Sequence, residues 1–188
     1  KAYEYFGAHF VKINNKEGCI FRVYAPQAKE ISVIGEFNNW DPGIDVMRKI
    51  DDCGVFEIFV PGVREYQSYK YHILTCGNYW VDKADPYGFL SEYKPGSCSR
   101  TFSIDNFIWH DEEWLKKRTR CFDEAVSIYE VHLGSWLGMR DGRYLSYEEV
   151  ADHLIKYVKD NGFTHVEIMP ITQYPFDGSW GYQATGFF

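Results

Sequence analysis

The chain has 188 residues, a formal net charge of −7 and 45% hydrophobic residues, a composition typical of an ordinary soluble globular protein. The acidic charge argues against nucleic acid or an anionic membrane surface as a partner, because both are bound by basic patches. A neutral partner such as a sugar polymer is compatible with this charge. Aromatic residues make up 19% of the chain, more than a modest core needs, and the surplus suits surfaces that stack on flat ligands.

The cysteines are odd in number, widely scattered and without a CxxC pair: Cys19, Cys53, Cys76, Cys98 and Cys121. Such spacing is a poor framework for disulfides and a poor zinc site. The sequence also lacks an apolar run approaching the ~20 residues of a membrane helix, and it lacks a signal-peptide pattern. We therefore expect a cytoplasmic protein with reduced thiols, no membrane contact, no metal and no cofactor.

Short strands separated by turn residues fill the chain up to about Arg100. The expected strands lie at residues 19–24, 31–34, 55–60, 69–75, 79–81 and 100–104. Short strands at this spacing are typical of an antiparallel sandwich of roughly seven strands. We therefore predict an all-β sandwich, immunoglobulin-like in architecture, for this part of the chain.

The C-terminal third shows a different pattern, which predicts a strand, a helix and a second strand. Residues 126–132 are apolar enough for a buried strand, and residues 166–169 form another short one. Between them, Ser146 and Glu149 form a capping box that opens a helix, and Gly162 ends it. Such a βαβ unit belongs to a parallel sheet covered by helices.

The boundary between the two parts is predicted near residues 118–123. This gives a sandwich with its linker at residues 1–118 and the first βαβ portion of a larger, incomplete fold at residues 119–188. Two parallel strands and one helix cannot bury both faces of such a sheet. We therefore expect its exposed edges and apolar face to be covered, either by the sandwich or by self-association with another copy of the chain.

Trp40, Lys70 and Trp80 are the residues of the first part that most suggest ligand binding. Trp40 follows an Asn38-Asn39 turn and is left on a loop, where it either plugs one end of the sandwich or forms a platform for a sugar ring. Lys70 is out of phase with its aromatic neighbours and should point outward, and Trp80 follows a tight turn. Two indoles and a cation on one face would suit a glucan.

The loop at residues 176–183 is the second informative stretch. It follows the second parallel strand, at the end of the sheet where barrel active sites are built. Its aromatic pair, Trp180 and Tyr182, is either packed in an ordinary loop or forms a wall on which sugars stack, and the second interpretation is favoured. His132, at the end of the first parallel strand, is interpreted as a buried structural histidine.

Six stretches, taken in order along the chain, together resemble the bacterial glycogen branching enzymes of the α-amylase clan. They are GAH at residues 7–9, FRVYAP at 21–26, GEFNNW at 35–40, KADPY at 83–87, IYEVHLGSW at 128–136 and PFDGSWGY at 175–182. Any one of them is suggestive, whereas the ordered set is specific. The resemblance implies a carbohydrate-binding module of family 48 followed by the start of a (β/α)8 barrel.

Enzymes of that family cleave an α-1,4-glucan and transfer the freed segment to a 6-hydroxyl, forming an α-1,6 branch by a retaining mechanism. Their aspartate nucleophile and glutamate acid/base come from barrel strands beyond the second, and no position of this chain matches them. The resemblance therefore implies a 1,4-α-glucan branching enzyme as the full-length protein. It also implies that this chain contains no catalytic residue and is inactive by itself.

The resemblance further implies which residues contact the α-glucan partner, whether glycogen, amylose or malto-oligosaccharide. Tyr182 matches the family tyrosine that stacks at the subsite for the transferred sugar, with Trp180 and Gln183 beside it. Three residues match the ligand face of related modules: Trp40, Lys70 and Trp80.

Two alternatives stay open. Instead of the N-terminal part of a branching enzyme, the chain could be a stand-alone α-glucan-binding module, or it could be the N-terminal part of a trehalohydrolase or debranching relative. Glycogen-binding relatives place an asparagine near residues 99–100 that is missing here, which weakens the assignment of the module's ligand face. The run at residues 177–183 favours branching over the other activities of the clan.

Overall fold

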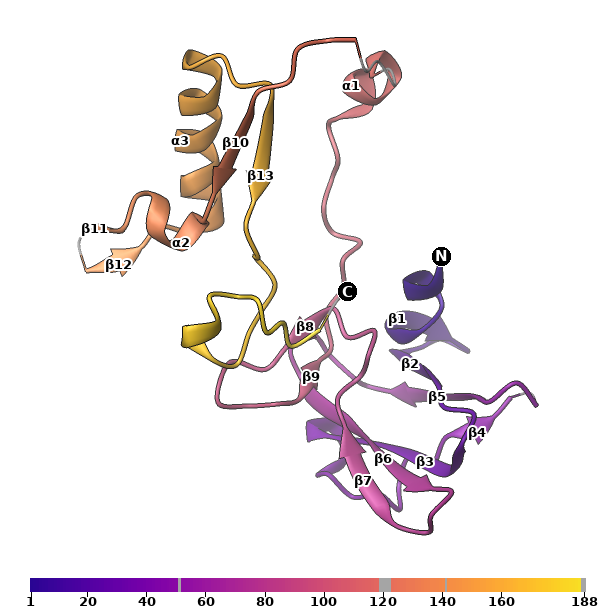
Figure 1. The fold of residues 1–188 in the computed structure, drawn as a ribbon. Coiled ribbons are helices and arrows are strands. Elements are labelled where there is room, and N and C mark those ends of the chain that lie inside the picture. The colour runs from indigo at the N-terminus through magenta and orange to yellow at the C-terminus, as the bar shows by residue number, and fades with distance from the viewer. Residues whose placement is uncertain (51, 119–122, 141, 187–188) are drawn as a thin grey trace. The chain divides into compact units, whose positions relative to one another are not determined.

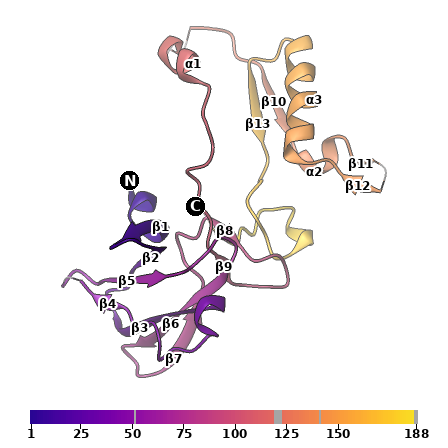
Figure 2. The same ribbon diagram turned by 180° about the vertical axis from the view of Figure 1, so that it is seen from behind.

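The computed structural model describes residues 1–50, 52–118, 123–140 and 142–186, and it divides into two compact units (Figures 1 and 2). The first unit comprises Lys1–Phe107 with Gln173–Asp177 and Gln183–Phe188, and the second comprises Ile108–Thr172 with Gly178–Tyr182. In the part of the chain that the structure describes, no helix has the length and apolar character needed to cross a membrane.

Two antiparallel sheets make up the body of the first unit (Figure 1). One sheet has the order β1-β2-β5-β4, with β1 (Gly7–Ile13), β2 (Lys16–Tyr24), β5 (Val55–Pro61) and β4 (Arg48–Lys49). The other has the order β3-β6-β9-β8, and β7 also pairs with β6. The strands of this second sheet are β3 (Ala28–Gly35), β6 (Ser68–Thr75), β9 (Ser99–Arg100), β8 (Leu90–Ser91) and β7 (Trp80–Lys83). Two short 3₁₀ helices are η1 (Ala2–Glu4) and η2 (Glu36–Asn38).

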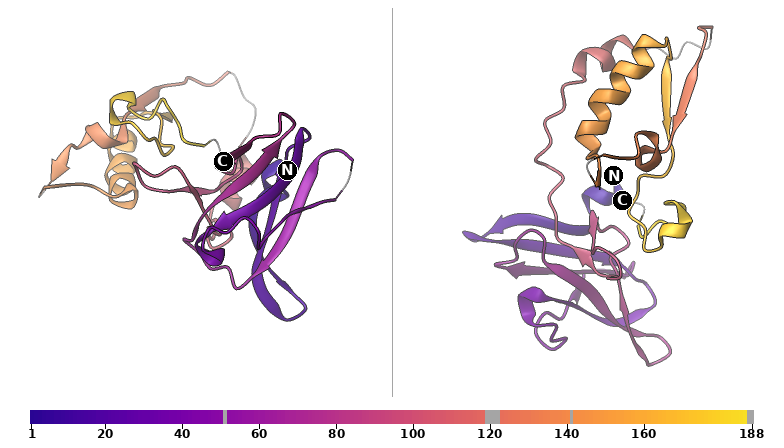
Figure 3. Two further views of the ribbon diagram at one scale, coloured as in Figure 1. Left: turned by 90° about the horizontal axis from the view of Figure 1, so that it is seen from below. Right: turned by 90° about the vertical axis from the view of Figure 1, so that its left-hand side faces the viewer.

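The core between these sheets is built from alternate residues of the long strands, whose side chains point to the same face. Phe21 of β2, Val33 of β3, and Tyr69 and Tyr71 of β6 are fully buried there. The rings of Phe21 and Tyr69 meet edge to face with their centroids 5.0 Å apart, so the two sheets are packed on each other. The predicted all-β sandwich is therefore confirmed, and Figure 3 shows it from two further sides.

The expected strand at residues 100–104 is shorter than predicted and ends at Arg100. The next residue, Thr101, is drawn into side-chain contacts, because its hydroxyl donates to the carbonyl of Arg64 at 2.7 Å and accepts from the amide of Gln67. The sequence analysis also gave no strand for β1, β4 or β8. The last two are only two residues long, too short for alternation to be visible.

The second unit is built on a parallel pair of strands, β10 (Ile128–Val131) and β13 (His165–Ile168). The helix α3 (Tyr147–Asp160) connects them and begins at the predicted capping box of Ser146 and Glu149. The shorter elements are α1 (Glu112–Lys117), α2 (Leu133–Trp136), β11 (Met139–Arg140), β12 (Arg143–Tyr144) and η3 (Asp177–Ser179). The predicted βαβ connection is confirmed.

The parallel pair is only partly buried, as two strands and a single helix imply. Ile128 of β10 is 55% exposed and Ile168 of β13 is 46% exposed, whereas Val131 is buried against Leu154 and Val158 of α3. One helix has one apolar face, so it covers only part of the pair. An apolar run predicts a strand but does not tell how many elements cover it. Self-association through this surface stays a prediction.

Candidate functional site

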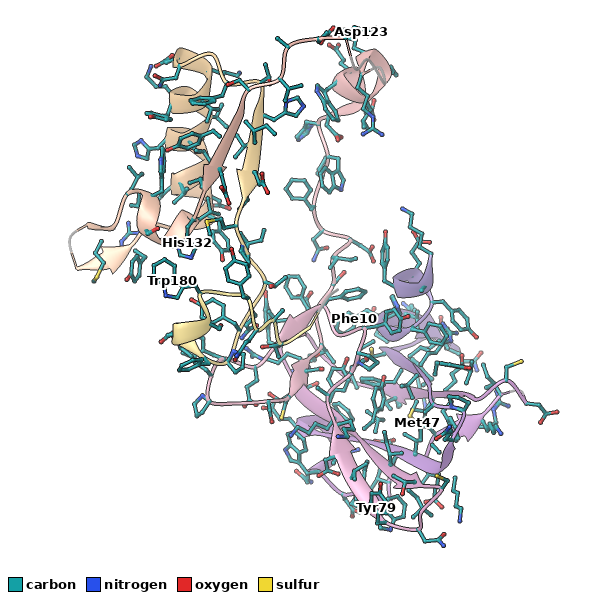
Figure 4. All side chains as sticks on the ribbon, viewed as in Figure 1. Phe10, Met47, Tyr79, Asp123, His132 and Trp180 are labelled. Atoms are coloured by element: carbon teal, nitrogen blue, oxygen red, sulfur yellow. The ribbon has the colours of Figure 1, made fainter. Side chains whose placement is uncertain are left out.

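The outer face of the hairpin formed by β6 and β7 carries two of the three residues proposed for the first unit. Tyr69 and Tyr71 of β6 point into the core, so Lys70 points outward, as the alternation predicts. Trp80 of β7 lies opposite Leu74 of β6, on the same outer face. Tyr79, labelled in Figure 4, marks the turn between the two strands.

Trp80 stacks on a histidine that the sequence analysis did not single out. The rings of Trp80 and His72 are almost parallel, at 8°, with centroids 4.4 Å apart. Nδ1 of His72 lies 2.6 Å from Oδ1 of Asp82, its partner in the β6–β7 register. Trp80 remains 45% exposed, so the face of the indole opposite the imidazole is the one available for stacking.

Lys70 is not alone on the face, because it contacts the loop between β8 and β9. Its Nζ donates to Oγ of Ser97 at 2.9 Å. In this loop, the thiol and the amide of Cys98 donate to the carboxylate of Glu92. These hydrogen bonds hold the pKa of the Glu92 carboxyl below its usual range, and the positive charge of Lys70 lowers that pKa as well. The ammonium group is therefore placed among oxygen atoms, where hydroxyl groups of a ligand could also reach it.

Trp40 lies in a turn held by the buried side chain of Asn38. Oδ1 of Asn38 accepts from the amide of Gly35 at 2.9 Å, and its Nδ2 donates to the carbonyl of Val33. Asn39 and Trp40 both have positive φ, 53° and 61°, and the Trp40 amide donates to the Gly35 carbonyl at 2.9 Å. Trp40 is 38% exposed, so part of its indole is accessible to a ligand.

Lys70 and Trp80 lie on one face of the sheet, and the turn that carries Trp40 begins at its edge. Gly35, where the Trp40 turn begins, pairs with Tyr69 of β6, next to Lys70. Trp80 lies opposite Leu74, four residues from Lys70 and thus about 13 Å along the strand. An extended ligand fits this arrangement better than a single small molecule.

In the second unit, Trp180 packs against His132 at the C-terminal end of β10 (Figure 4). Their ring centroids are 5.4 Å apart, and Nδ1 of His132 lies 3.0 Å from Oγ of Ser135. His132 is only partly buried, so its interpretation as a buried structural histidine is wrong. Gly181 fixes the turn beyond Trp180, since it has a φ of 89° and a Cβ there would lie 2.9 Å from the carbonyl oxygen of Pro170.

Tyr182 and Gln183 are the other two residues proposed for this loop. The Tyr182 ring is 66% exposed, and its amide donates to the carbonyl of Ser179 at 3.0 Å. Gln183 is exposed and belongs to the first unit, whereas Trp180 and Tyr182 belong to the second.

The segment Gln173–Asp177 of the first unit is tied to a loop of the sandwich. Nε2 of Gln173 donates to the carbonyl of Glu92 at 2.8 Å. Lys94 forms an ion pair with Asp177, and its Nζ lies 5.8 Å from the centre of the Tyr174 ring. These partners are about 80 residues apart in sequence, so local patterns gave no signal for them.

A buried carboxylate in the sandwich core was also missed. Oδ2 of Asp85 accepts from the hydroxyls of Tyr69 and Tyr71 at 2.8 and 2.9 Å, and Oδ1 accepts from the Tyr87 amide at 2.8 Å. Burial raises the pKa of the Asp85 carboxyl, although these donors act to lower it. Asp85 is closed off in the core and is structural. Within the described residues, no cluster of His, Cys, Asp and Glu could hold a metal ion.

Comparison with known proteins gives consistent matches. Residues 5–88 match the family model described as carbohydrate-binding module 48 (isoamylase N-terminal domain). The whole chain is 43% identical to the 1,4-alpha-glucan branching enzyme GlgB of Bacillus subtilis and 45% identical to that of Halothermothrix orenii, covering 30% of each. It is 46% identical to GlgB of Saccharophagus degradans and covers 26% of it. The resemblance to the N-terminal part of branching enzymes is thus confirmed, and the chain spans less than a third of these relatives.

A solved structure from Salmonella typhimurium, described as an alpha amylase, is also similar. Its TM-score is 0.67 at 20% identity, and the match covers 96% of this chain and 27% of that one. At this level of identity the likeness concerns the fold alone.

Proposed function

We propose that this chain is the N-terminal part of an α-glucan branching enzyme and that its sandwich unit binds α-glucan on the outer face of β6 and β7. The observation that carries the proposal is the exposed indole of Trp80, stacked at 4.4 Å on His72 within the segment that matches carbohydrate-binding module 48. The names of the relatives support the enzyme class.

The chemistry of the face suits a neutral sugar polymer. The indoles of Trp40 and Trp80 offer flat apolar surfaces for the C–H faces of sugar rings, and an aromatic side chain with a polar edge is suited to a half-wet site. Lys70 supplies a donor for hydroxyl groups. The net charge of −7 does not repel a neutral ligand, and glycogen, amylose and malto-oligosaccharides are the expected partners.

The branching reaction itself needs residues beyond those assigned here. A retaining transfer from an α-1,4 to an α-1,6 linkage uses a carboxylate nucleophile and a carboxyl acid/base, and we assign neither to this chain. We propose that Tyr182, with Trp180 and Gln183, contacts the glucan segment in the complete enzyme. The division into residues 1–118 and 119–188 and a cytoplasmic location belong to the same proposal.

Glucan binding can be tested by titrating the chain with maltoheptaose in a calorimeter. Trp80→Ala is expected to weaken binding about tenfold or more, equivalent to about 1.4 kcal/mol, and Trp40→Ala and Lys70→Ala less. Trp114→Ala is the matched control, because Trp114 is also an exposed tryptophan but lies in α1. Equal binding by all four variants and the unmodified chain would refute this face as the site.

The relatives compared above are all named branching enzymes, which favours that activity over the debranching and trehalose-forming alternatives. A stand-alone binding module would not require the parallel pair β10 and β13, which exposes Ile128, Val166 and Ile168.

A further inference from the structure

Trp80 lies on β7, which pairs with β6, and its side chain is exposed rather than packed in the core. An exposed indole can rotate among several rotamers, and ordering it on binding costs free energy. A sugar platform works best when the ring is already held in one orientation. The question is therefore what fixes Trp80 in the free protein.

His72 is placed to do this. It lies on β6, between β3, where Ser32 is its partner, and β7, where Asp82 is its partner, so its backbone is held on both sides. Its imidazole covers one face of the Trp80 indole at 4.4 Å and 8°. A stacked ring at this distance restricts the indole, because rotation would break the contact along the whole ring face.

Asp82 in turn fixes the imidazole. Its Oδ1 lies 2.6 Å from Nδ1 of His72, the distance of a strong hydrogen bond between an N–H donor and a carboxylate. A hydrogen bond at Nδ1 sets both the plane of the ring and the nitrogen that carries the proton. Asp82, His72 and Trp80 therefore form a chain of contacts on one face of the hairpin.

We propose that His72 and Asp82 are positioning residues that hold Trp80 as a one-sided platform for an α-glucan. The inference rests on the proposed function, since it deepens the role of the same face. It assigns the sugar to the indole face opposite His72. It also predicts that His72 and Asp82 act through Trp80 and strengthen binding without touching the ligand.

The test compares maltoheptaose affinity among variants of the full chain. His72→Ala removes the stack and is expected to weaken binding about two- to tenfold, the range for freeing one side chain. His72→Phe keeps an aromatic ring in place and is expected to restore most of the affinity. Asp82→Ala, which changes a half-exposed side chain, is expected to have a smaller effect of the same sign. His153→Ala on α3 is the control, since His153 is an exposed histidine of the other unit.

The outcomes separate this inference from the proposed function. If Trp80→Ala binds like the unmodified chain, the proposed site itself is wrong. If Trp80→Ala loses binding while His72→Ala and Asp82→Ala do not, the site stands and the positioning role is overturned. If His72→Phe binds as weakly as His72→Ala, stacking is not how His72 acts, and the inference fails in that case too. Should His72→Ala unfold, judged by circular dichroism, His72→Phe and Asp82→Ala still decide.

Discussion

Replacing Asp85 by alanine should destabilise the sandwich more than any change on its surface. The fully buried hydroxyls of Tyr69 and Tyr71 both donate to the Asp85 carboxylate. A buried donor left without an acceptor costs about 1–3 kcal/mol, so the two hydroxyls together predict a loss of about 2–6 kcal/mol. Typical domains have a free energy of unfolding of about 5–15 kcal/mol, so Asp85→Ala removes a large share of it.

Asp85→Asn removes the ionisable group but keeps one acceptor oxygen for the two tyrosine hydroxyls. Burial raises the pKa of Asp85 above its ordinary value of 3.8, so the folded state binds the proton more tightly than the unfolded state does. The stability from this group is fully present below pH 3.8 and is lost as the pH rises through the folded pKa. Asparagine does not titrate, so the unmodified chain should lose stability relative to Asp85→Asn as the pH rises through this range.

Urea unfolding followed by far-ultraviolet circular dichroism, at about pH 4 and about pH 8, measures both effects. Asp85→Ala is expected to have a much lower free energy of unfolding than the unmodified chain at both pH values. The free energy of unfolding of the unmodified chain, relative to that of Asp85→Asn, is expected to fall as the pH rises. A pH-independent difference, or a change of the opposite sign, would refute the reasoning about the buried charge. Little loss for Asp85→Ala would refute the reasoning about the hydrogen bonds.

Three further changes test other contacts. The Arg143 guanidinium lowers the pKa of Glu149 to about 2, so Arg143→Ala should move it toward the usual 4.5 in an NMR titration; no movement would exclude the contact in solution. In the unmodified chain, the stability that the Arg143–Glu149 pair contributes to the folded state should be lost as the pH falls from 4.5 toward 2. Ser146→Ala removes the helix cap and should cost about 0.5–2 kcal/mol in urea unfolding, whereas no cost would contradict the cap. Lys94→Ala should speed hydrogen exchange at residues 173–177, and unchanged exchange would show that Lys94 does not hold this segment.

Local patterns in the sequence predict the structure correctly where both partners lie close together along the chain. Alternation alone predicted that Lys70 points outward, and the structure confirms it. The capping box of Ser146 and Glu149 is formed as predicted, because both partners lie within one helical turn. The parallel pairing of β10 and β13 is predicted by the helix that connects them, because a strand–helix–strand unit belongs to a parallel sheet.

Local patterns give no signal where the partners are distant in sequence, or where burial of a strand depends on how many elements pack against it. The carboxylate of Asp85 accepts hydrogen bonds from two tyrosines that lie 16 and 14 residues away in the sequence. The residues next to Asp85 do not indicate that it is buried. The stack of His72 on Trp80 depends on the register of a hairpin, which shifts every side chain to the other face if it slips by one residue. Ile128 is exposed in a run that is apolar enough for a buried strand, because hydrophobicity does not say whether a second helix covers the strand.

The register of the β6–β7 hairpin connects the core of the sandwich with its proposed binding face. Alternation sends Tyr71 inward to Asp85 and His72 outward to Asp82 and Trp80. The hydrogen bond between Tyr71 and Asp85 thus specifies the position of β6 from inside, and that position sets where His72 meets Trp80 outside. A slip by one residue would bury an imidazole and expose a tyrosine, and the polar core contact makes that slip costly. The buried carboxylate therefore helps to hold the strand that carries the proposed sugar-binding face.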